Sequence, residues 1–341
     1  MNRADMSFLI VGLGSMGKRR IRCLAALGCK NVAGFDLRSD RRSETSQKYA
    51  IKTYADFDEA VNAAKPGALF ISVPPDVHHV YMKRAIGHKV PFFVEASVLD
   101  TDMELILGAS KDVLMAPSAT LLFHPAIRKI SEILASGELG KISNFILHSG
   151  QYLEDWHTYE KVSDFYVSNP VTGGAREITP FELTWITRLL GFPKRVCGNV
   201  RKTITIRGAE SIDDTYNFLL DYDHFLASIT IDVVSRSAIR RVLVNGDKKQ
   251  LVWNWSENCV KLYNPATAQW EQAEYQLPPA AAGYNASISE GMYIDEVENF
   301  LNALQGEGTF INDMENDWRV LKLLYAVEES HKTSQYVRFE A

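Results

Sequence analysis

The chain has 341 residues, of which 46% are hydrophobic and 23% charged, enough for two soluble domains of ordinary size. The formal net charge is −5 and there is no basic block, which argues against a nucleic-acid partner. No apolar run is long enough to span a bilayer, and residues 1–6 are too polar for a signal peptide. We expect free thiols in a reducing cytoplasm, because no C-x-x-C spacing joins the four cysteines Cys23, Cys29, Cys197 and Cys259.

A glycine-rich turn follows the first apolar stretch. Residues 8–11 predict a short strand, and Gly12, Gly14 and Gly17 then form the pattern G-x-G-x-x-G. The first glycine permits the tight turn, the second lets a pyrophosphate approach the backbone, and the third lets helix and strand pack closely. The N–H groups of a helix start bind phosphates. We therefore predict a dinucleotide site whose helix start comprises Ser15, Met16 and Gly17.

An acidic residue ends the second predicted strand, residues 31–35. Asp36 lies near the roughly 20-residue offset expected for a ribose ligand, and a carboxylate there favours NAD. A 2′-phosphate at this position would meet a negative charge. Arginines close by in the sequence could neutralise that charge, which leaves NADP open, or they could simply form a solvated helix face. They are Arg38, Arg41 and Arg42.

Residues 7–118 alternate apolar runs with helical patterns, which is typical of a doubly wound parallel sheet. The expected strands are 8–11, 31–35, 68–73, 91–94 and 113–115, and the helices after the first are 38–48, 57–64, 80–86 and 103–110. Ligands bind beyond the carboxyl ends of such strands. We therefore expect a second group of residues at the cofactor site, namely Val73, Pro74, Pro75, His78 and Glu95.

From residue 142 the pattern changes to short alternating runs, which predict a largely antiparallel open sheet with one buried face. The expected strands are 144–148, 196–206, 215–222, 227–234, 240–244, 250–255 and 259–263, and the helices are 125–136, 181–190, 292–304 and 317–328. The predicted fold class is α/β, with a Rossmann domain over 1–120 and an α+β domain over 121–341 whose last helices are free to pack back on the first. The second sheet face predicts a homodimer or homotetramer.

Several segments together resemble the Gfo/Idh/MocA oxidoreductases, named for glucose–fructose oxidoreductase and inositol dehydrogenase. Besides the glycine turn they are 72–79 (SVPPDVHH), 123–125 (FHP), 136–142 (SGELGKI), 173–175 (GGA) and 293–300 (YIDEVENF). The segment 150–157 (GQYLEDWH) is similar to the branch found with surface-polysaccharide and nonulosonic, sialic-acid-like sugar pathways. The resemblance implies an NAD(P) domain followed by a substrate domain, and hydride transfer between nicotinamide and a sugar or cyclitol carbinol.

The chain departs from this family at three polar site positions. The family has Glu-Lys-Pro after the strand ending at residue 94, whereas here Glu95 is followed by Ala96 and the lysine is missing. The family also has an Asp after its Gly-Gly segment and a His four residues later. With one residue deleted, Glu177 takes the Asp position and Phe181 the His position. The usual arginine before the Phe-His-Pro segment is replaced by Leu122.

A carbinol that loses a hydride must also give up its hydroxyl proton, preferably to a group with a pKa near the working pH. We consider three catalytic candidates, His157, Glu177 and Glu182. His157 titrates in the right range unperturbed, whereas Glu177 needs burial to raise its pKa. For substrate binding we consider Trp156, Tyr159, Arg176 and Phe181. Each could instead have a purely structural role, and we predict no metal site because no ligand set has metal spacing.

The sequence therefore favours a cytoplasmic NAD(P)-dependent oxidoreductase that acts on a sugar phosphate or nucleotide-activated sugar and does not contact membranes. Two alternatives stay open because the usual lysine and histidine are absent. One is a redox-neutral sugar enzyme of the epimerase, lyase or glycosidase type that holds NAD tightly. The other is a sensor that binds NAD and sugar without turnover.

Overall fold

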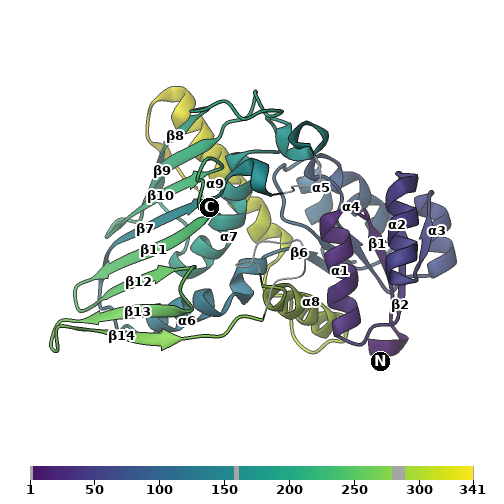
Figure 1. Ribbon diagram of the computed structural model, residues 1–341, viewed down its shortest axis with the longest axis horizontal. Coiled ribbons are helices and arrows are strands. Elements are labelled where there is room, and N and C mark those ends of the chain that lie inside the picture. Colours follow the sequence, from purple (N-terminus) through teal and green to yellow (C-terminus); the bar gives the residue numbers. More distant parts are fainter. Residues whose placement is uncertain (1–2, 157–160, 279–288, 341) are drawn as a thin grey trace. The chain divides into compact units, whose positions relative to one another are not determined.

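The computed structural model describes residues 3–156, 161–278 and 289–340 (Figure 1). The chain divides into two compact units. The first comprises Met1–Thr120 with Glu290–Trp318, and the second comprises Leu121–Ser289 with Arg319–Ala341. No helix among the described residues is both long and apolar enough to cross a membrane.

The first unit contains a six-stranded parallel sheet in the order β3-β2-β1-β4-β5-β6, which confirms the predicted Rossmann architecture. Its strands are β1 (Ser7–Val11), β2 (Asn31–Phe35), β3 (Lys52–Tyr54), β4 (Ala68–Ile71), β5 (Phe92–Val94) and β6 (Met115–Pro117). Its helices are α1 (Ser15–Ala26), α2 (Ser39–Tyr49), α3 (Phe57–Ala64), α4 (His78–Gly87), α5 (Met103–Gly108) and α8 (Gly291–Leu304).

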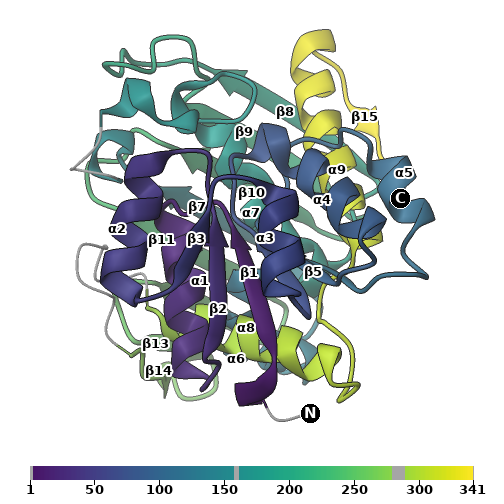
Figure 2. The ribbon, with the colours of Figure 1, turned by 90° about the vertical axis from the view of Figure 1, so that its right-hand side faces the viewer.

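The central strands of this sheet are apolar along their whole length because both faces are covered. All four residues of β4 and the last four of β1 are 0% exposed, so neither strand alternates polar and apolar positions. Figure 2 shows β1 and β2 side by side, in parallel register from Ser7 opposite Asn31 to Val11 opposite Phe35. The three-residue strand β3 was not predicted, because a strand that short has no recognisable period.

The second unit contains a nine-stranded sheet in the order β14-β13-β12-β11-β7-β10-β9-β8-β15. It is antiparallel except where β7 and β10 pair in parallel, so the predicted mostly antiparallel sheet is confirmed. The strands are β7 (Ile142–Gly150), β8 (Arg195–Arg201), β9 (Thr215–Asp221), β10 (Leu226–Asp232), β11 (Ile239–Gly246), β12 (Gln250–Asn254), β13 (Cys259–Asn264), β14 (Gln269–Glu274) and β15 (Val337–Arg338). The helices are α6 (Pro125–Ala135), α7 (Ala175–Leu190) and α9 (Met314–Thr333), whose first residues belong to the first unit.

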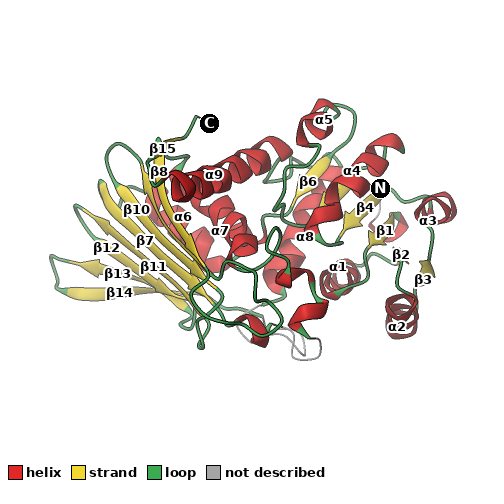
Figure 3. Ribbon diagram, turned by 90° about the horizontal axis from the view of Figure 1, so that it is seen from above, coloured by secondary structure: helices red, strands yellow, loops and turns green. Residues whose placement is uncertain are grey.

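One face of the large sheet is covered by α6 and α7 (Figure 3). On β7 the side chain of Phe145 is 0% exposed and packs against Trp185 of α7, whereas its neighbour Ile146 points to the other face and is 41% exposed. This alternation is what the period of two predicted. Leu226 of β10 is exposed on the same outer face as Ile146.

Helix α7 begins at Ala175, six residues before its predicted start at residue 181. A proline inside a helix removes one backbone hydrogen bond. In the structure Pro180 lies within the helix, and buried side chains on both sides of it pack into the unit. As a result Arg176, Glu177 and Phe181 lie on one continuous helix.

Candidate functional site

The glycine turn between β1 and α1 has the geometry that its sequence pattern requires. Gly12 has a φ of +93°, and a Cβ there would lie 2.6 Å from the Ser72 carbonyl oxygen. A Cβ on Gly17 would lie 1.9 Å from the Gly12 carbonyl oxygen. Gly14 is the N-cap of α1 and has no side chain to cover the N–H groups of the first turn. The turn therefore leaves a helix N-terminus open to an anion such as a pyrophosphate.

Asp36, at the end of β2, is fixed in place by the turn that it faces. Its Oδ2 accepts a hydrogen bond from the Leu13 N–H at 2.8 Å and its Oδ1 accepts one from the Arg38 N–H at 2.8 Å. The residue is 6% exposed. Each carboxylate oxygen can accept a further bond, so Asp36 can bind a ribose diol without losing these contacts. The residues present thus fit a dinucleotide.

The three arginines after Asp36 have different positions. The Arg38 side chain forms an ion pair with Asp40 at 2.6 Å, and Arg42 donates to the backbone carbonyls of Asp36 and Leu37. The Arg41 Nη1 lies 3.9 Å from the Asp36 Oδ2. It also lies 3.4 Å from where a Cβ on Gly14 would be. The guanidinium beside the glycine turn is therefore that of Arg41. Arg38 contacts Asp36 through its backbone N–H.

The chain that leaves β4 is held by a buried histidine. His78 is 3% exposed, and its Nε2 lies 2.9 Å from the Val73 carbonyl oxygen. Burial lowers the pKa of His78 to about 4, so the ring is neutral and donates this bond. Its contact fixes the exit formed by Val73, Pro74 and the short helix at Pro75. The structure thus gives His78 a positioning role at the predicted cofactor edge.

Glu95, at the end of β5, was predicted to contact the cofactor, and its described partners are protein groups. It accepts two hydrogen bonds from Arg20, at 2.8 and 2.7 Å, and one from the Ser72 hydroxyl at 2.9 Å. Burial opposes ionisation of Glu95, but the adjoining Arg20 outweighs it and the pKa of this carboxyl lies below its usual range. Glu95 therefore anchors α1 to the sheet edge, and its contact with a cofactor stays a prediction.

Glu177 has an unusual environment in the first turn of α7. Its Oε1 accepts a hydrogen bond from the Tyr166 hydroxyl, and its Oε2 is shielded from solvent with no partner among the described residues. Burial raises the pKa of Glu177 to about 7, and the Tyr166 bond opposes this only in part. A carboxyl that titrates near neutrality with one oxygen unused is suited to accept or release a proton.

Two other predicted site residues on α7 have several contacts with protein groups. Glu182 is 0% exposed and accepts bonds from Ser149, Trp185 and Arg240. All of these donors are protein side chains, so Glu182 has the contacts of a packing residue. The Arg176 guanidinium is similarly engaged, with Glu328 at 2.7 Å and the Val171 carbonyl at 2.6 Å. The site roles predicted for Glu182 and Arg176 stay predictions.

The remaining predicted substrate residues lie in the second unit. Phe181 is half-buried, one helical turn after Glu177. The indole Nε1 of Trp156 is shielded from solvent and has no partner among the described residues. Buried polar atoms rarely lack a partner, so Trp156 and Glu177 share a feature that favours a role in ligand binding. His157 and Tyr159 lie outside the described residues.

Sequence reasoning missed two further residues, Tyr166 and Asp317. Tyr166 precedes Glu177 by 11 positions, and no motif connects them. Asp317 is 3% exposed, and burial raises its pKa to about 7 although the adjacent Ser97 hydroxyl lowers it. An acidic residue in the first turn of a helix normally indicates a solvated cap, so no sequence pattern indicates that Asp317 is buried.

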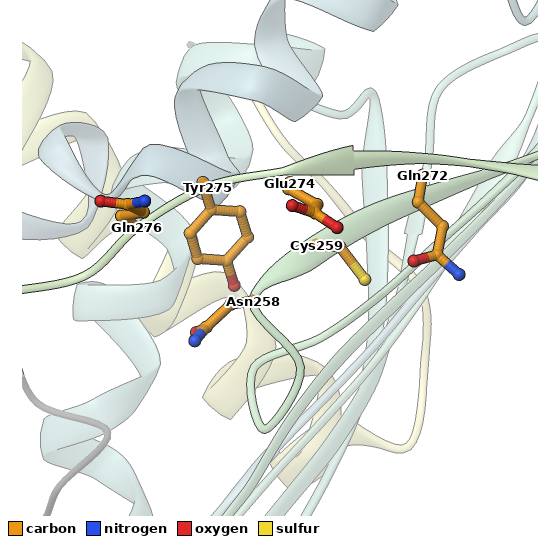
Figure 4. A pocket seen from close by; sticks show the side chains of 6 residues that line it. All are labelled: Asn258, Cys259, Gln272, Glu274, Tyr275 and Gln276. Carbon is orange, nitrogen blue, oxygen red and sulfur yellow. The ribbon is translucent and has the colours of Figure 1, made fainter.

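A cavity of about 450 Å³ lies at the edge of the large sheet, where β13 begins and β14 ends (Figure 4). Its lining comprises Asn258, Cys259, Gln272, Glu274, Tyr275 and Gln276. The Tyr275 hydroxyl is already engaged, because it accepts from the Trp253 indole and donates to the Glu257 carbonyl. None of the predicted site residues lines this cavity. The candidate site is therefore identified from the chemistry of its side chains and not from this cavity.

Comparison with known proteins supports a dinucleotide-binding first unit. Residues 6–98 match the model of the oxidoreductase family with an NAD-binding Rossmann fold (GFO_IDH_MocA), and residues 127–252 match the model of the GFO/IDH/MocA C-terminal domain. No curated protein sequence is similar enough to count as a match. The two family models together cover well over half of the chain.

Solved structures share the fold over nearly the whole length. Levoglucosan dehydrogenase in complex with NADH has 15% identity and a TM-score of 0.84, over 98% of this chain and 99% of that one. An Agrobacterium radiobacter oxidoreductase in complex with NAD+, L-tartaric acid and magnesium has 12% identity and a TM-score of 0.84, over 98% of each chain. A Kribbella flavida oxidoreductase domain protein has 15% identity and a TM-score of 0.84, over 99% of this chain and 100% of that one. With the glycine turn and Asp36 in place, the chain belongs to the Gfo/Idh/MocA family of oxidoreductases, and its first unit is an NAD-binding Rossmann domain.

Proposed function

We propose that this protein is an NAD-dependent dehydrogenase or reductase of a sugar derivative, with Glu177 as the proton carrier. The observation that supports it most is the Glu177 carboxyl, which has an unused oxygen and a pKa raised to about 7 by burial. The family is one of NAD-binding oxidoreductases. A protein of the same fold, levoglucosan dehydrogenase, has been solved with NADH and with levoglucosan or L-sorbose.

The proposed reaction needs a group that holds the nucleotide and a group that carries a proton. The turn at Gly12–Gly17 and the Asp36 carboxylate would hold NAD, which would supply the hydride acceptor. On oxidation the carbinol C–H leaves as a hydride, the O–H proton passes to Oε2 of Glu177, and a C=O bond forms. Glu177 ends as a neutral acid and returns the proton in the reverse direction.

We propose further that the cofactor site admits NADP as well as NAD through Arg41. The Asp36 carboxylate favours the ribose diol of NAD, but Arg41 lies 3.9 Å from it and can pair with a 2′-phosphate. Arg41→Ala is expected to weaken NADP+ binding roughly 10-fold or more and NAD+ binding much less. Calorimetric titration of both nucleotides measures this ratio. Arg38→Ala is the matched control, because its guanidinium pairs with Asp40; an unchanged ratio in Arg41→Ala contradicts the assignment.

Two features favour a second candidate, a redox-neutral sugar enzyme that keeps NAD bound. The family's lysine position holds Ala96 and its histidine position holds Phe181, neither of which carries a proton. A non-catalytic NAD and sugar sensor is a third candidate on the same grounds, but it does not explain why the Glu177 carboxyl is shielded and has a raised pKa.

One assay distinguishes the three candidates. The purified protein is incubated with NAD+ and a panel of sugar phosphates and nucleotide-activated sugars, while NADH absorbance and product mass are recorded. We expect net NADH formation with at least one sugar. A changed sugar without net NADH would indicate the redox-neutral enzyme, and binding without any turnover would indicate the sensor.

We propose surface-polysaccharide or sialic-acid-like sugar synthesis as the pathway, which rests on the resemblance of residues 150–157. We also propose that the outer face of the large sheet mediates a homodimer or homotetramer. Ile146 and Leu226 expose apolar surface there, at 41% and 49%. A cytoplasmic location stays a prediction from cysteine usage, and the described cysteines are all free thiols.

A further inference from the structure

The segment before α7 is built to bring one tyrosine to the start of that helix. Tyr166 opens a short 3-10 helix (Tyr166–Ser168), which is followed by a turn that ends in two glycines. A Cβ on Gly173 would lie 1.9 Å from the Val167 carbonyl oxygen, and the Gly174 N–H donates to that oxygen at 3.2 Å. Only a residue without a side chain at position 173 allows this approach, so the backbone of the short helix is fastened to the first turn of α7.

A second contact fixes the backbone of Tyr166 itself. The Thr172 hydroxyl donates to the Tyr166 carbonyl at 3.3 Å, and Thr172 is 1% exposed. The Gly173 N–H donates to the Asn169 carbonyl at 2.7 Å and closes the turn. The phenol that leaves this fixed backbone donates to Oε1 of Glu177. The Tyr166–Glu177 bond is therefore set by local backbone geometry.

Other charged groups near the start of α7 are directed elsewhere. Arg176 pairs with Glu328, and Glu328 also accepts a hydrogen bond from Tyr216. The backbone carbonyl of Asp213 accepts a hydrogen bond from the Ala175 N–H. Burial raises the pKa of the Asp213 carboxyl, His331 opposes this rise and Glu328 adds to it. No cation within the described part of the chain contributes to the state of the Glu177 carboxyl, for which burial and Tyr166 are the causes.

We propose that Tyr166 is a positioning residue for proton transfer: its hydroxyl holds Oε1 of Glu177, so that Oε2 is the oxygen that exchanges the proton with the substrate. This inference rests on the proposed function and adds to it a residue from a different segment. The hydroxyl stabilises the carboxylate form, so it also sets the pH at which the carrier becomes a base. Tyr166 does not itself give up a proton in this scheme.

The test is a pH titration of Tyr166→Phe. Removing the hydroxyl removes a hydrogen bond to the charged carboxylate, so the Glu177 midpoint is expected to rise by about one pH unit. For a sugar that is oxidised in the panel, the acidic limb of kcat/KM then moves upward by the same amount. Without any such sugar, the same midpoint is read from the infrared band of the protonated carboxyl. That measurement uses an Asp317→Asn background, because Asp317 also has a pKa of about 7.

Two further variants keep this test decisive. Tyr216→Phe removes another tyrosine hydroxyl from a carboxylate of the same unit, Glu328, and is expected to leave the midpoint unchanged. Gly173→Ala displaces the short helix that carries Tyr166 and is expected to reproduce the upward shift. A Tyr166→Phe protein that folds with an unshifted midpoint overturns the inference, and so does a shift that Tyr216→Phe reproduces.

Failure of the wider proposal gives a different result. If Glu177→Gln keeps full turnover, Glu177 is not the proton carrier and the proposed mechanism is wrong, whatever Tyr166 does. If Glu177→Gln is inactive while Tyr166→Phe has the wild-type midpoint, the mechanism stands and only the role of Tyr166 is rejected.

Discussion

Glu177→Gln is expected to reduce sugar oxidation about 10²- to 10⁴-fold and to leave NAD+ affinity unchanged. The amide keeps the shape of the side chain and can still accept the Tyr166 hydrogen bond, but it cannot take up a proton. The proposed nucleotide contacts are on the first unit, at the glycine turn and Asp36. The rate is read from NADH formation with the best sugar of the panel, and affinity from calorimetry.

The rate of sugar oxidation should depend on pH in a definite direction. Because the pKa of Glu177 is raised to about 7, wild-type oxidation should increase as pH rises through about 7, where the carboxylate forms. Reduction needs the protonated acid and should show the opposite trend. The residual activity of Glu177→Gln should lack this transition. A variant that keeps both the rate and the transition would show that another group carries the proton.

Thermal melting of Glu177→Gln distinguishes a loss of proton transfer from a loss of folding. A carboxyl whose folded pKa is raised from 4.5 to about 7 contributes stability that is present at pH values below 4.5 and lost as pH rises through 7. Glu177→Gln should therefore melt no lower than wild type at pH 8. Asp317→Asn is the matched control, since it removes a second buried carboxyl with a pKa of about 7, and we expect it to retain turnover.

The parts of the cofactor site that depend on local sterics could be predicted from the sequence. Gly12 and Gly17 are required by contacts within the turn or with the next strand of the sheet, and such requirements appear as a fixed spacing. Asp36 could also be predicted from its spacing, because β2 pairs with β1 up to Phe35 and the next residue therefore lies beside the glycine turn. The first sheet followed from its apolar runs, and the only strand missed there was the three-residue β3.

The candidate residues on α7 could not be sorted from the sequence, because their partners are distant. Glu182 is held by Ser149, 33 positions away, and by Arg240, 58 positions away. Arg176 pairs with Glu328, 152 positions away. Glu177 lies five positions before Glu182 on the same helix, yet lacks such a partner. Which acid is a structural anchor and which is available for chemistry is decided by these tertiary contacts.

Arg20 holds the first unit together through a buried ionic cluster, and this cluster carries the second large prediction. Its guanidinium is 0% exposed and pairs with Glu95 at 2.7 Å and with Glu296 at 2.9 Å. Glu296 also accepts bonds from the segment that ends the unit, through Ser118, Ala119 and Thr120. One cation thus joins α1, the end of β5 and helix α8, which returns from the far end of the chain.

Arg20→Met is expected to destabilise the protein by about 3–5 kcal/mol, because it leaves two buried carboxylates without their cation. Thermal melting should fall by roughly 10 °C. The pKa of each carboxyl should rise in the variant, so the loss of stability should be greatest above pH 7 and should shrink as pH falls toward the unfolded-state pKa of 4.5.

Arg22→Met is the matched control on the same helix, since its pair with Glu290 is 28% exposed on the arginine side and should contribute about 1 kcal/mol or less. Adding Glu95→Gln and Glu296→Gln to Arg20→Met should recover part of the loss. Equal melting of Arg20→Met and Arg22→Met would show that the cluster does not hold α8 in place.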